Sequence, residues 1–153
     1  MITNSRNVLL GVLLSCLIPA GFGHAQESGA SPIGVWANEG ETSRIKIEDC
    51  AGKLCGVIVW LKEPLDSQGN EKVDKENPDA SLKSRKLLGL RLLDGFAKKE
   101  GEATVWENGT IYNPNEGKTY KCTLTVKDAR TLNVRGYVGL PIFGKSQTWT
   151  RVE

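Results

Sequence analysis

Histidine is almost absent from this sequence. The single histidine, His24, lies in an N-terminal stretch that has the features of a cleaved signal, so the rest of the chain has none. Without an imidazole, the chain cannot build a Ser-His-Asp or Cys-His catalytic site, and it lacks the ligand that most catalytic zinc sites use. We therefore predict no catalytic residue of these classes, no metal site and no cofactor.

An excess of charge of one sign is also missing. The chain has 20 lysine and arginine residues against 18 aspartate and glutamate residues, and the loss of Arg6 with a signal leaves 19 against 18. Nucleic acids and anionic membranes attract proteins through clustered lysine and arginine. The composition therefore gives no reason to expect a nucleic acid or an anionic membrane as a partner.

The N terminus has the pattern of an export signal. Arg6 precedes an apolar run over residues 8–18, and Gly23-His24-Ala25 supplies the small residues that a signal peptidase reads. We expect cleavage after Ala25, so that residues 1–25 form the signal peptide. The product is expected in the periplasm or secreted, with no transmembrane span in the mature chain.

Two alternatives to a cleaved signal are weaker. The apolar run is shorter than the ~20 residues that span a bilayer, which argues against an uncleaved anchor. Lipidation at Cys16 is a minor option because Leu14 is bulky for a lipoprotein cleavage site. After cleavage we expect a flexible leader over residues 26–32 and a single domain over residues 33–153.

Cysteine is scarce, and three cysteines remain after cleavage. Cys50 and Cys55 flank a short segment whose Gly52 marks a tight turn between two strand patterns. An oxidising destination allows these two to form a disulfide, which we predict. Cys122 alternates with polar residues on an apolar face, so a buried, inert thiol is the favoured interpretation.

Strand patterns run through the rest of the chain, and the clearest lies between Lys118 and Val138. Apolar and polar residues alternate there with a period of two on both sides of the polar segment 128–130, which predicts an antiparallel hairpin with one wet face. The run over residues 86–96 is also predicted as a strand, because its two glycines penalise a helix. The count is about eight strands, which is the number that closes a small antiparallel barrel.

The longest irregular stretch covers residues 62–85. It contains side-chain oxygens that can bind Ca²⁺, among them those of Asp66, Asp74, Asn77 and Asp79. Their spacing does not match an ordered pattern such as the EF-hand loop. Turn formation by Asp, Asn and Gly in a solvated loop is the favoured interpretation, and loops of this length are either functional or mobile.

A series of short motifs resembles a known family. In chain order they include Gly34-x-Trp36, Cys50-x-Gly52-x-Leu54-Cys55-Gly56, Val59-Trp60-Leu61, Asn77-Pro78, Leu88-Gly89-Leu90, Gly109-x-Ile111-Tyr112-Asn113-Pro114, Gly117-Lys118-Thr119-Tyr120, Arg135-Gly136-Tyr137-Val138-Gly139 and Thr148-Trp149-Thr150-Arg151. Their order is similar to that of the bacterial exported family catalogued as domain of unknown function 2147. The first and last motifs also resemble the lipocalin or calycin signature.

The resemblance implies an all-β fold, a single antiparallel eight-stranded lipocalin-like β-barrel in the cell envelope, with no established activity. It also implies that Trp36 on the first strand closes one barrel end and that Arg151 on the last strand stacks across it. A cation–π contact is the physical basis of such a pair. No catalytic or binding residues can be transferred from the family.

Aromatic and apolar residues supply the remaining candidates. Trp60, Trp106, Tyr112 and Tyr137 are predicted to line a ligand cavity, although each of them can instead fill the core or lie outside the barrel. The tip Leu140-Pro141-Ile142-Phe143 lies between glycines. Its Leu140, Ile142 and Phe143 are candidates for contact with a partner or a membrane surface, or for folding back over a barrel end.

Three functions are consistent with these features. The leading hypothesis is a non-enzymatic barrel that binds a small apolar or amphipathic ligand at the end away from Trp36. The second is a structural or protein-interaction module of the envelope that uses the apolar tip to contact an envelope protein. A hydrolase built on paired carboxylates is the third, and no pair of acids stands out for it.

Overall fold

The structure is a computed structural model that describes Met1 and residues 31–153. The expected signal peptide, and the expected leader as far as residue 30, therefore lie outside the described residues. From Ile33 onward the chain folds into strands joined by turns, with two short 3₁₀ helices, η1 (Ala80–Leu82) and η2 (Pro141–Phe143). No described helix is long and apolar enough to cross a membrane.

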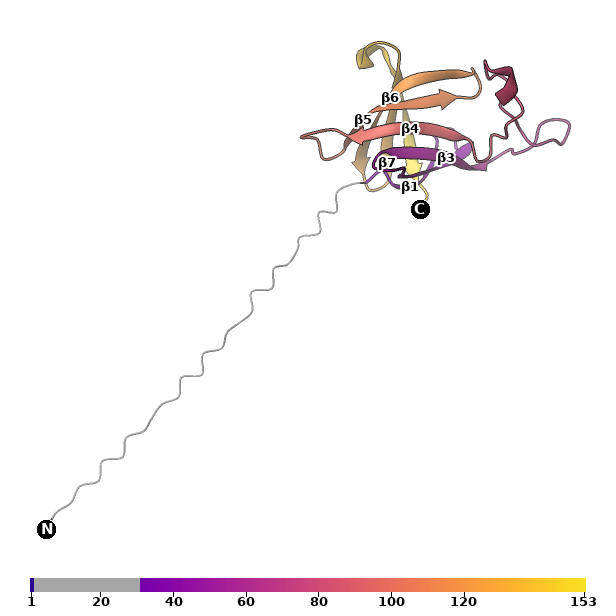
Figure 1. The fold of residues 1–153 in the computed structure, drawn as a ribbon. Coiled ribbons are helices and arrows are strands. Elements are labelled where there is room, and N and C mark those ends of the chain that lie inside the picture. The colour runs from indigo at the N-terminus through magenta and orange to yellow at the C-terminus, as the bar shows by residue number, and fades with distance from the viewer. Residues whose placement is uncertain (2–30) are drawn as a thin grey trace.

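Eight antiparallel strands close into one barrel in which each strand pairs with the next in sequence and the last pairs with the first (Figure 1). The strands are β1 (Gly34–Ala37), β2 (Ser43–Asp49), β3 (Leu54–Leu61), β4 (Arg91–Lys98), β5 (Val105–Asn113), β6 (Lys118–Asp128), β7 (Thr131–Tyr137) and β8 (Lys145–Arg151). The predicted all-β, eight-stranded barrel is confirmed. Closure leaves no sheet edge unpaired.

The predicted hairpin over residues 118–138 is β6 and β7, with Leu124 opposite Val134. The strand predicted over residues 86–96 is also present, but it begins at Arg91. The residues before it turn instead, because Gly89 has a φ of +86° and the amide of Leu90 donates to the carbonyl of Leu87. Periodicity thus identified the strand but misplaced its start.

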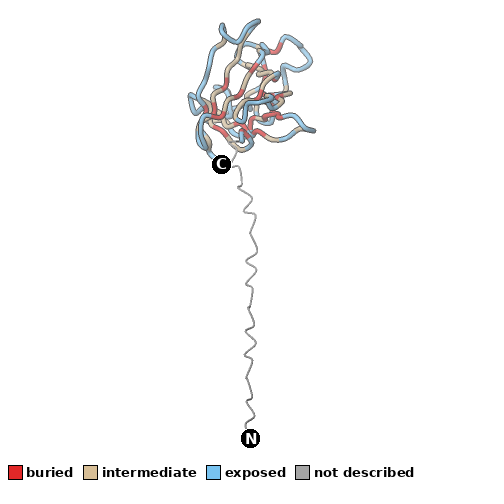
Figure 2. Tube along the Cα trace, turned by 90° about the vertical axis from the view of Figure 1, so that its left-hand side faces the viewer, coloured by how far each residue is buried: buried red, intermediate tan, exposed pale blue. Residues whose placement is uncertain are grey.

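Because neighbouring strands are antiparallel, successive turns lie at opposite ends of the barrel. The connections 38–42, 62–90, 114–117 and 138–144 lie at one end, which we call the open end. The turns 50–53, 99–104 and 129–130 lie at the other, the closed end. Buried positions alternate with exposed ones along the strands, as the period of two requires (Figure 2).

The half of the barrel near the closed end is filled by its own side chains. Fully or almost fully buried residues there include Trp36, Ile47, Leu54, Leu93, Phe96, Val126 and Leu132. Phe96 lies directly against Gly109, where an added Cβ would come within 2.4 Å of the phenyl ring. A glycine at that position is therefore required for the ring to cross the barrel.

The closed end is fastened by Arg151. Its guanidinium carbon lies 4.2 Å from the centre of the Trp36 ring, which is the pairing that the resemblance implied. The guanidinium also donates to the carbonyl oxygens of Ala129 (2.7 Å), Ile33 (2.7 Å) and Ser31. One side chain thus ties the last strand to the β6–β7 turn and to the chain before β1.

The segment before β1 is part of this end. Pro32 is fully buried, and its carbonyl accepts a hydrogen bond of 2.7 Å from the Trp36 indole. Ser31 and Pro32 are the last residues of the segment expected to be a leader, and their carbonyl oxygens accept hydrogen bonds from Arg151 and Trp36.

Candidate functional site

The half of the barrel near the open end contains a cavity of about 1000 Å³ that opens to solvent. Its apolar wall is formed by Ile45, Ile58, Leu61, Leu92, Ile111, Val134 and Trp149. Pockets that bind small molecules have volumes of roughly 300–1000 Å³ and mostly apolar walls with a few polar groups. The cavity is therefore large enough for a small-molecule ligand.

Strand alternation and one glycine create this space. Val134 and Gly136 on β7 face inward, but Gly136 has no side chain to fill the volume in front of it. A Cβ at Gly136 would lie 3.4 Å from Ile111, which is ordinary contact distance. The space at this position is thus left free by the absence of a side chain, without any backbone requirement for glycine.

The floor of the cavity is Trp149 on β8. Its ring is buried, and the indole nitrogen donates to the side-chain oxygen of Gln147 at 2.9 Å. Trp149 also belongs to the buried hydrophobic cluster that contains Trp36, Phe96 and Leu132, and it lies opposite Leu132 in the sheet. The same ring therefore separates the filled half of the barrel from the hollow one.

Polar and charged side chains surround the cavity mouth. Lys72 forms an ion pair with Glu63 (3.3 Å), and the hydroxyl of Tyr120 donates to the Glu116 carboxylate, which raises the pKa of Tyr120. The other charged lining residues are Lys62 and Lys145, and neither forms an ion pair with a described residue. The charged lining residues are therefore three lysines against two glutamates, a net charge of +1.

The long connection between β3 and β4 is anchored to β5 by a buried carboxylate. Asp74 is fully buried and accepts hydrogen bonds from the Tyr112 hydroxyl (2.7 Å), the Asn77 amide (2.8 Å) and Arg85 (2.8 Å). Burial alone would raise the pKa of Asp74, but these three donors outweigh it and hold the pKa below the usual value of 3.8. The carboxylate therefore stays ionised at neutral pH.

The same connection closes tightly on the β5–β6 turn. Gly117 has a φ of +64°, and a Cβ there would lie 1.9 Å from the carbonyl oxygen of Glu76. Asp66 accepts from the amides of Gln68 and Asn70, and Asp79 caps η1 by accepting from the Ser81 amide. These contacts match the turn-forming interpretation of the loop, because the carboxylates are engaged by donors of their own chain.

The four aromatic candidates are divided by the structure. Tyr112 and Tyr137 line the mouth of the cavity. Trp60 is 39% exposed on the outer surface, beneath the Arg44 guanidinium, 4.7 Å from the ring centre. Trp106 is buried in the core cluster with the Lys98 amine over its ring. The expectation that Trp60 and Trp106 line the cavity does not hold.

A register shift explains the position of Trp60. Ile45 lies opposite Ile58, but the neighbouring Arg44 lies opposite Trp60, so Val59 is the extra residue of a bulge. A bulge reverses the face on which the following residues point. Trp60 therefore faces outward where strict alternation from Ile58 would have placed it inside.

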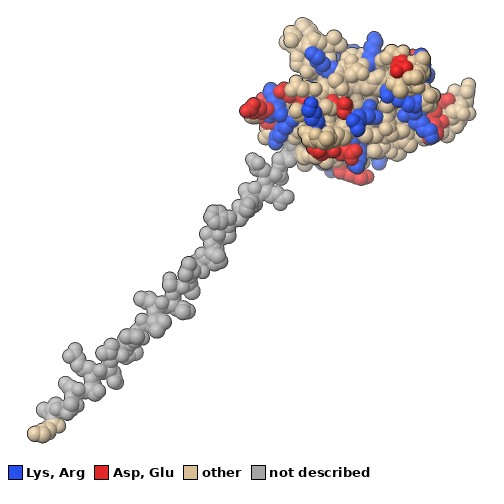
Figure 3. Space-filling view, viewed as in Figure 1, with Lys and Arg blue, Asp and Glu red and all other residues tan. Residues whose placement is uncertain are grey.

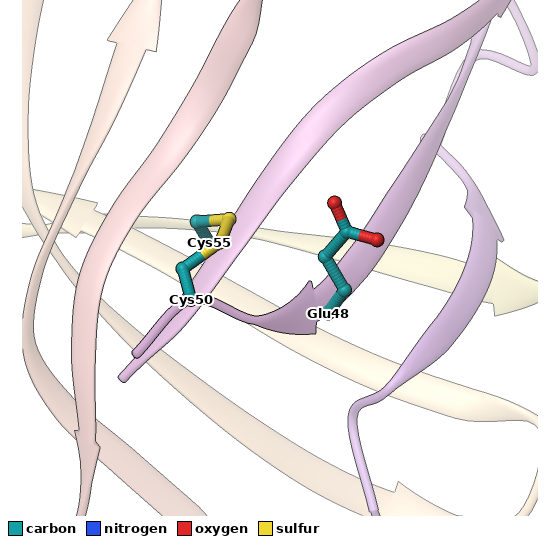
Figure 4. A group of neighbouring side chains, drawn as sticks. All are labelled: Glu48, Cys50 and Cys55. Atoms are coloured by element: carbon teal, nitrogen blue, oxygen red, sulfur yellow. A yellow bond between two sulfur atoms is a disulfide. The ribbon is translucent and has the colours of Figure 1, made fainter. Parts of the chain in front are cut away.

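The predicted disulfide between Cys50 and Cys55 is confirmed. It joins the two ends of the β2–β3 turn, with the Glu48 carboxylate beside it (Figure 4). Two sulfurs bonded to each other are not thiolates, so this group of three is not a metal site in the oxidised protein. Cys122 is free and fully buried, and burial raises the pKa of its thiol to about 12.

The apolar tip lies at the open end, in the loop between β7 and β8. Leu140, Ile142 and Phe143 are well exposed, and Phe143 also contributes to the cavity mouth. The tip therefore does not fold back into the barrel. Sequence reasoning found this loop but missed Gly136, Lys62 and Lys145, because the depth of a residue along the barrel axis has no local sequence signal.

The chain matches a family model described as an uncharacterized protein conserved in bacteria (DUF2147), over residues 34–151. It belongs to this family. The match spans all eight strands, from the first residue of β1 to the last of β8. The predicted family is confirmed, and no curated protein gives a significant match.

A solved structure has the same fold. Protein HP1028 from the human pathogen Helicobacter pylori, described as belonging to the lipocalin family, superposes with a TM-score of 0.67 at 23% sequence identity. The alignment covers 81% of this chain and 84% of that protein. At this level of identity the likeness shows a lipocalin-like fold for this member of the DUF2147 family, and the fold alone.

Proposed function

We propose that this DUF2147 protein is a non-enzymatic binding protein whose barrel takes up one small amphipathic molecule. The observation that carries the proposal is the cavity of about 1000 Å³ with an apolar wall and a polar mouth. Eight-stranded barrels are wide enough to hold one small ligand. The apolar part of the ligand lies against Trp149 and Val134, and its polar end lies at the mouth.

The charge at the mouth narrows the ligand class. Lys62 and Lys145 are the two charged lining residues without an ionic or tyrosine partner among residues 31–153. An anionic head group near either amine gains Coulomb attraction, while a cationic one is disfavoured. A carboxylate or phosphate on an aliphatic tail therefore fits the site better than a neutral or cationic amphiphile.

The compartment is part of the proposal. Residues 1–25 act as a signal peptide, and the mature protein works in the periplasm or is secreted. The disulfide supports this, because disulfides persist in oxidising compartments. In protein from a periplasmic extract, we expect the N-terminal peptide to begin at residue 26, which mass spectrometry can show. A peptide that begins at Met1 would contradict export by cleavage.

An enzyme built on carboxylates receives little support. Among residues 31–153, the acids with shifted pKa values are Asp66, Asp74, Asp79 and Asp128, and in each case hydrogen bonds lower the pKa. A general acid needs a raised pKa. None of these four acids lines the described cavity.

The binding test uses two variants at one position. Gly136→Leu places a branched side chain in the cavity, while Gly136→Ala adds one methyl group at ordinary contact distance from Ile111. The probe is a fatty acid with a dansyl group, whose emission rises on transfer from water to an apolar site. We expect saturable binding to the parent, near-parent binding to Gly136→Ala and a loss of at least about tenfold in affinity for Gly136→Leu.

Thermal unfolding is the control for folding, and Gly136→Leu is expected to melt no lower than the parent because it fills empty space. A dansylated alkylamine tests the head-group chemistry and should bind more weakly than the fatty acid. Equal binding of the fatty acid by all three proteins would contradict uptake into the cavity. Equal binding of acid and amine would contradict the assigned head-group class.

A further inference from the structure

The β7–β8 loop exposes large apolar side chains in a group. Val138 is 72%, Leu140 63%, Ile142 75% and Phe143 78% exposed. In Figure 1 the loop is the gold segment that projects at the top, and Figure 3 shows few charged atoms on it in the same view. Grouped apolar residues on a protein surface mark a contact site for a protein or a membrane.

The loop is held in this projecting form by Arg135. The guanidinium donates to the carbonyl of Pro141 (2.7 Å), to the carbonyl of Ile142 (3.2 Å) and to the hydroxyl of Ser146 (2.9 Å). Pro141 also begins η2, where its ring fixes the backbone. The apolar side chains are thus kept in water, although a free loop would lower its energy by folding them onto the barrel.

The strand ends that flank the loop are basic. Across residues 114–121 and 131–149, the basic residues are Lys118, Lys121, Arg135 and Lys145, and the one acid is Glu116. A second acid, Glu39, lies beside β8 and accepts a hydrogen bond from the Thr148 amide at 3.3 Å, so four basic residues face two acids. Tyr120 donates to Glu116, and none of the three lysines forms an ion pair with a described residue. The overall composition gave no reason to expect an anionic membrane as partner, but folding gathers a local excess of positive charge here.

We propose that this loop docks the open end of the barrel onto a lipid bilayer with anionic headgroups. Apolar side chains that insert below the headgroups, together with lysines near the surface, are the two contributions that bind a protein to such a bilayer. A protein partner is less favoured, because a stable interface buries about 800 Å² and 20–30 residues on each side, far more than one short loop offers.

Docking in this orientation sets the cavity mouth against the lipid. Val138 and Phe143 belong to the loop and also line the cavity mouth. An amphipathic molecule can therefore pass from the bilayer into the barrel along one continuous apolar surface. The docking proposal adds to the proposed function without depending on it. Vesicle binding is measured on protein without ligand, so either proposal can fail alone.

The test uses protein in the form that its bacterial host produces, with the N terminus identified by mass spectrometry. Vesicles of phosphatidylcholine and of an equimolar mixture with phosphatidylglycerol are sedimented with the parent and with Phe143→Asp. Val59→Asp is the matched control, because Val59 is exposed on β3 and lies outside the loop. All three proteins carry the same N terminus, so a difference between them reports on the substituted site.

We expect the parent and Val59→Asp to bind the mixed vesicles and Phe143→Asp to bind at least about tenfold more weakly. Lys121→Ala is expected to weaken binding to the mixed vesicles by about fivefold and to leave binding to phosphatidylcholine alone unchanged. Gly136→Leu is expected to bind vesicles like the parent while losing the fatty acid.

Two results would overturn the docking proposal. One is that the parent and Phe143→Asp sediment with the vesicles to the same extent, or that neither protein sediments with them. The other is a parent that elutes as a dimer, does not bind vesicles and becomes monomeric on the Phe143→Asp substitution. That second result would assign the loop to self-association.

Discussion

The two halves of the barrel are built from the same strands but are packed differently. Near the closed end, the interior is filled by buried side chains such as Trp36, Phe96 and Leu132, and Arg151 joins the last strand to the β6–β7 turn and to the segment before β1. Near the open end, Gly136 has no side chain to fill the interior, and the connection 62–90 is long. The comparison separates a half that is packed by its own side chains from a half in which we propose that the ligand binds.

The two halves are nevertheless parts of one barrel. Each strand runs through both halves and is hydrogen-bonded to its neighbours along its length. The packed half therefore also holds the backbone of the hollow half in place. The hollow half therefore keeps its shape without filling its own interior. The long connection 62–90 needs a separate anchor, and the Asp74 cluster provides it.

The largest expected contrast comes from matched leucine truncations. Leu132→Ala removes a fully buried side chain from the packed half and should lower the free energy of unfolding by about 3–5 kcal/mol. Leu61→Ala removes a side chain from the cavity wall and should cost about 1 kcal/mol or less, because the wall already borders empty space. Urea unfolding measures both, and similar losses would contradict the division into two halves.

A pair of cations gives the next contrast. Arg151→Ala removes the contact with Trp36 and the hydrogen bonds to backbone carbonyls, at a cost of about 3 kcal/mol in the free energy of unfolding. Lys145→Ala should change that free energy by less than about 0.5 kcal/mol. It should instead weaken binding of the dansylated fatty acid by about two- to fivefold. The comparison fails if Lys145→Ala destabilises the protein as much as Arg151→Ala.

The smallest expected effect is a loss of local stability in the connection 62–90, at the open end, when the pH is lowered. Because its folded-state pKa is lowered, Asp74 stabilises the connection at pH values above 3.8, and this contribution is lost as the pH falls through the lower folded-state value. We expect about 1–3 kcal/mol of local stability to disappear there. Hydrogen exchange should show it at the amides of Asp74 and Leu87, which donate to Arg85 and Lys72.

Asp74→Asn is the control for that measurement. The variant has no carboxylate at this position, so its exchange protection should be lower at neutral pH and should not fall further through the same acid range. The closed-end strands of both proteins should remain protected. A parent whose connection keeps full protection in acid would show that the ionised carboxylate does not anchor it.

Much of the fold could be predicted from the sequence because its cause is local. The alternation from Lys118 to Val138 reports which face of the sheet each residue occupies, and Gly52 between two cysteines reports a turn that a disulfide can close. The pairing of Trp36 with Arg151 followed from the family resemblance. The alternation and the turn required no knowledge of distant neighbours, whereas this pair joins the first strand to the last and depended on the resemblance.

The cavity could not be predicted in the same way. Whether an inward side chain packs in the core or borders the cavity depends on its depth along the barrel axis. Trp106 and Trp149 are both buried, but only Trp149 lines the cavity. Bulges add a second uncertainty, since the one near Ile58 turned Trp60 outward. The Asp74 cluster joins residues separated by 38 positions, and only the folded chain brings Tyr112 to that carboxylate.

The central claim is that the tail of an amphipathic ligand lies in the hollow half against Trp149. A brominated stearic acid tests it directly, because bromine quenches tryptophan fluorescence only at short range. Saturable quenching of the parent should be largely lost in Trp149→Phe and retained in Trp60→Phe and Trp106→Phe. Undiminished quenching in Trp149→Phe, or its loss in Trp60→Phe, would contradict the account.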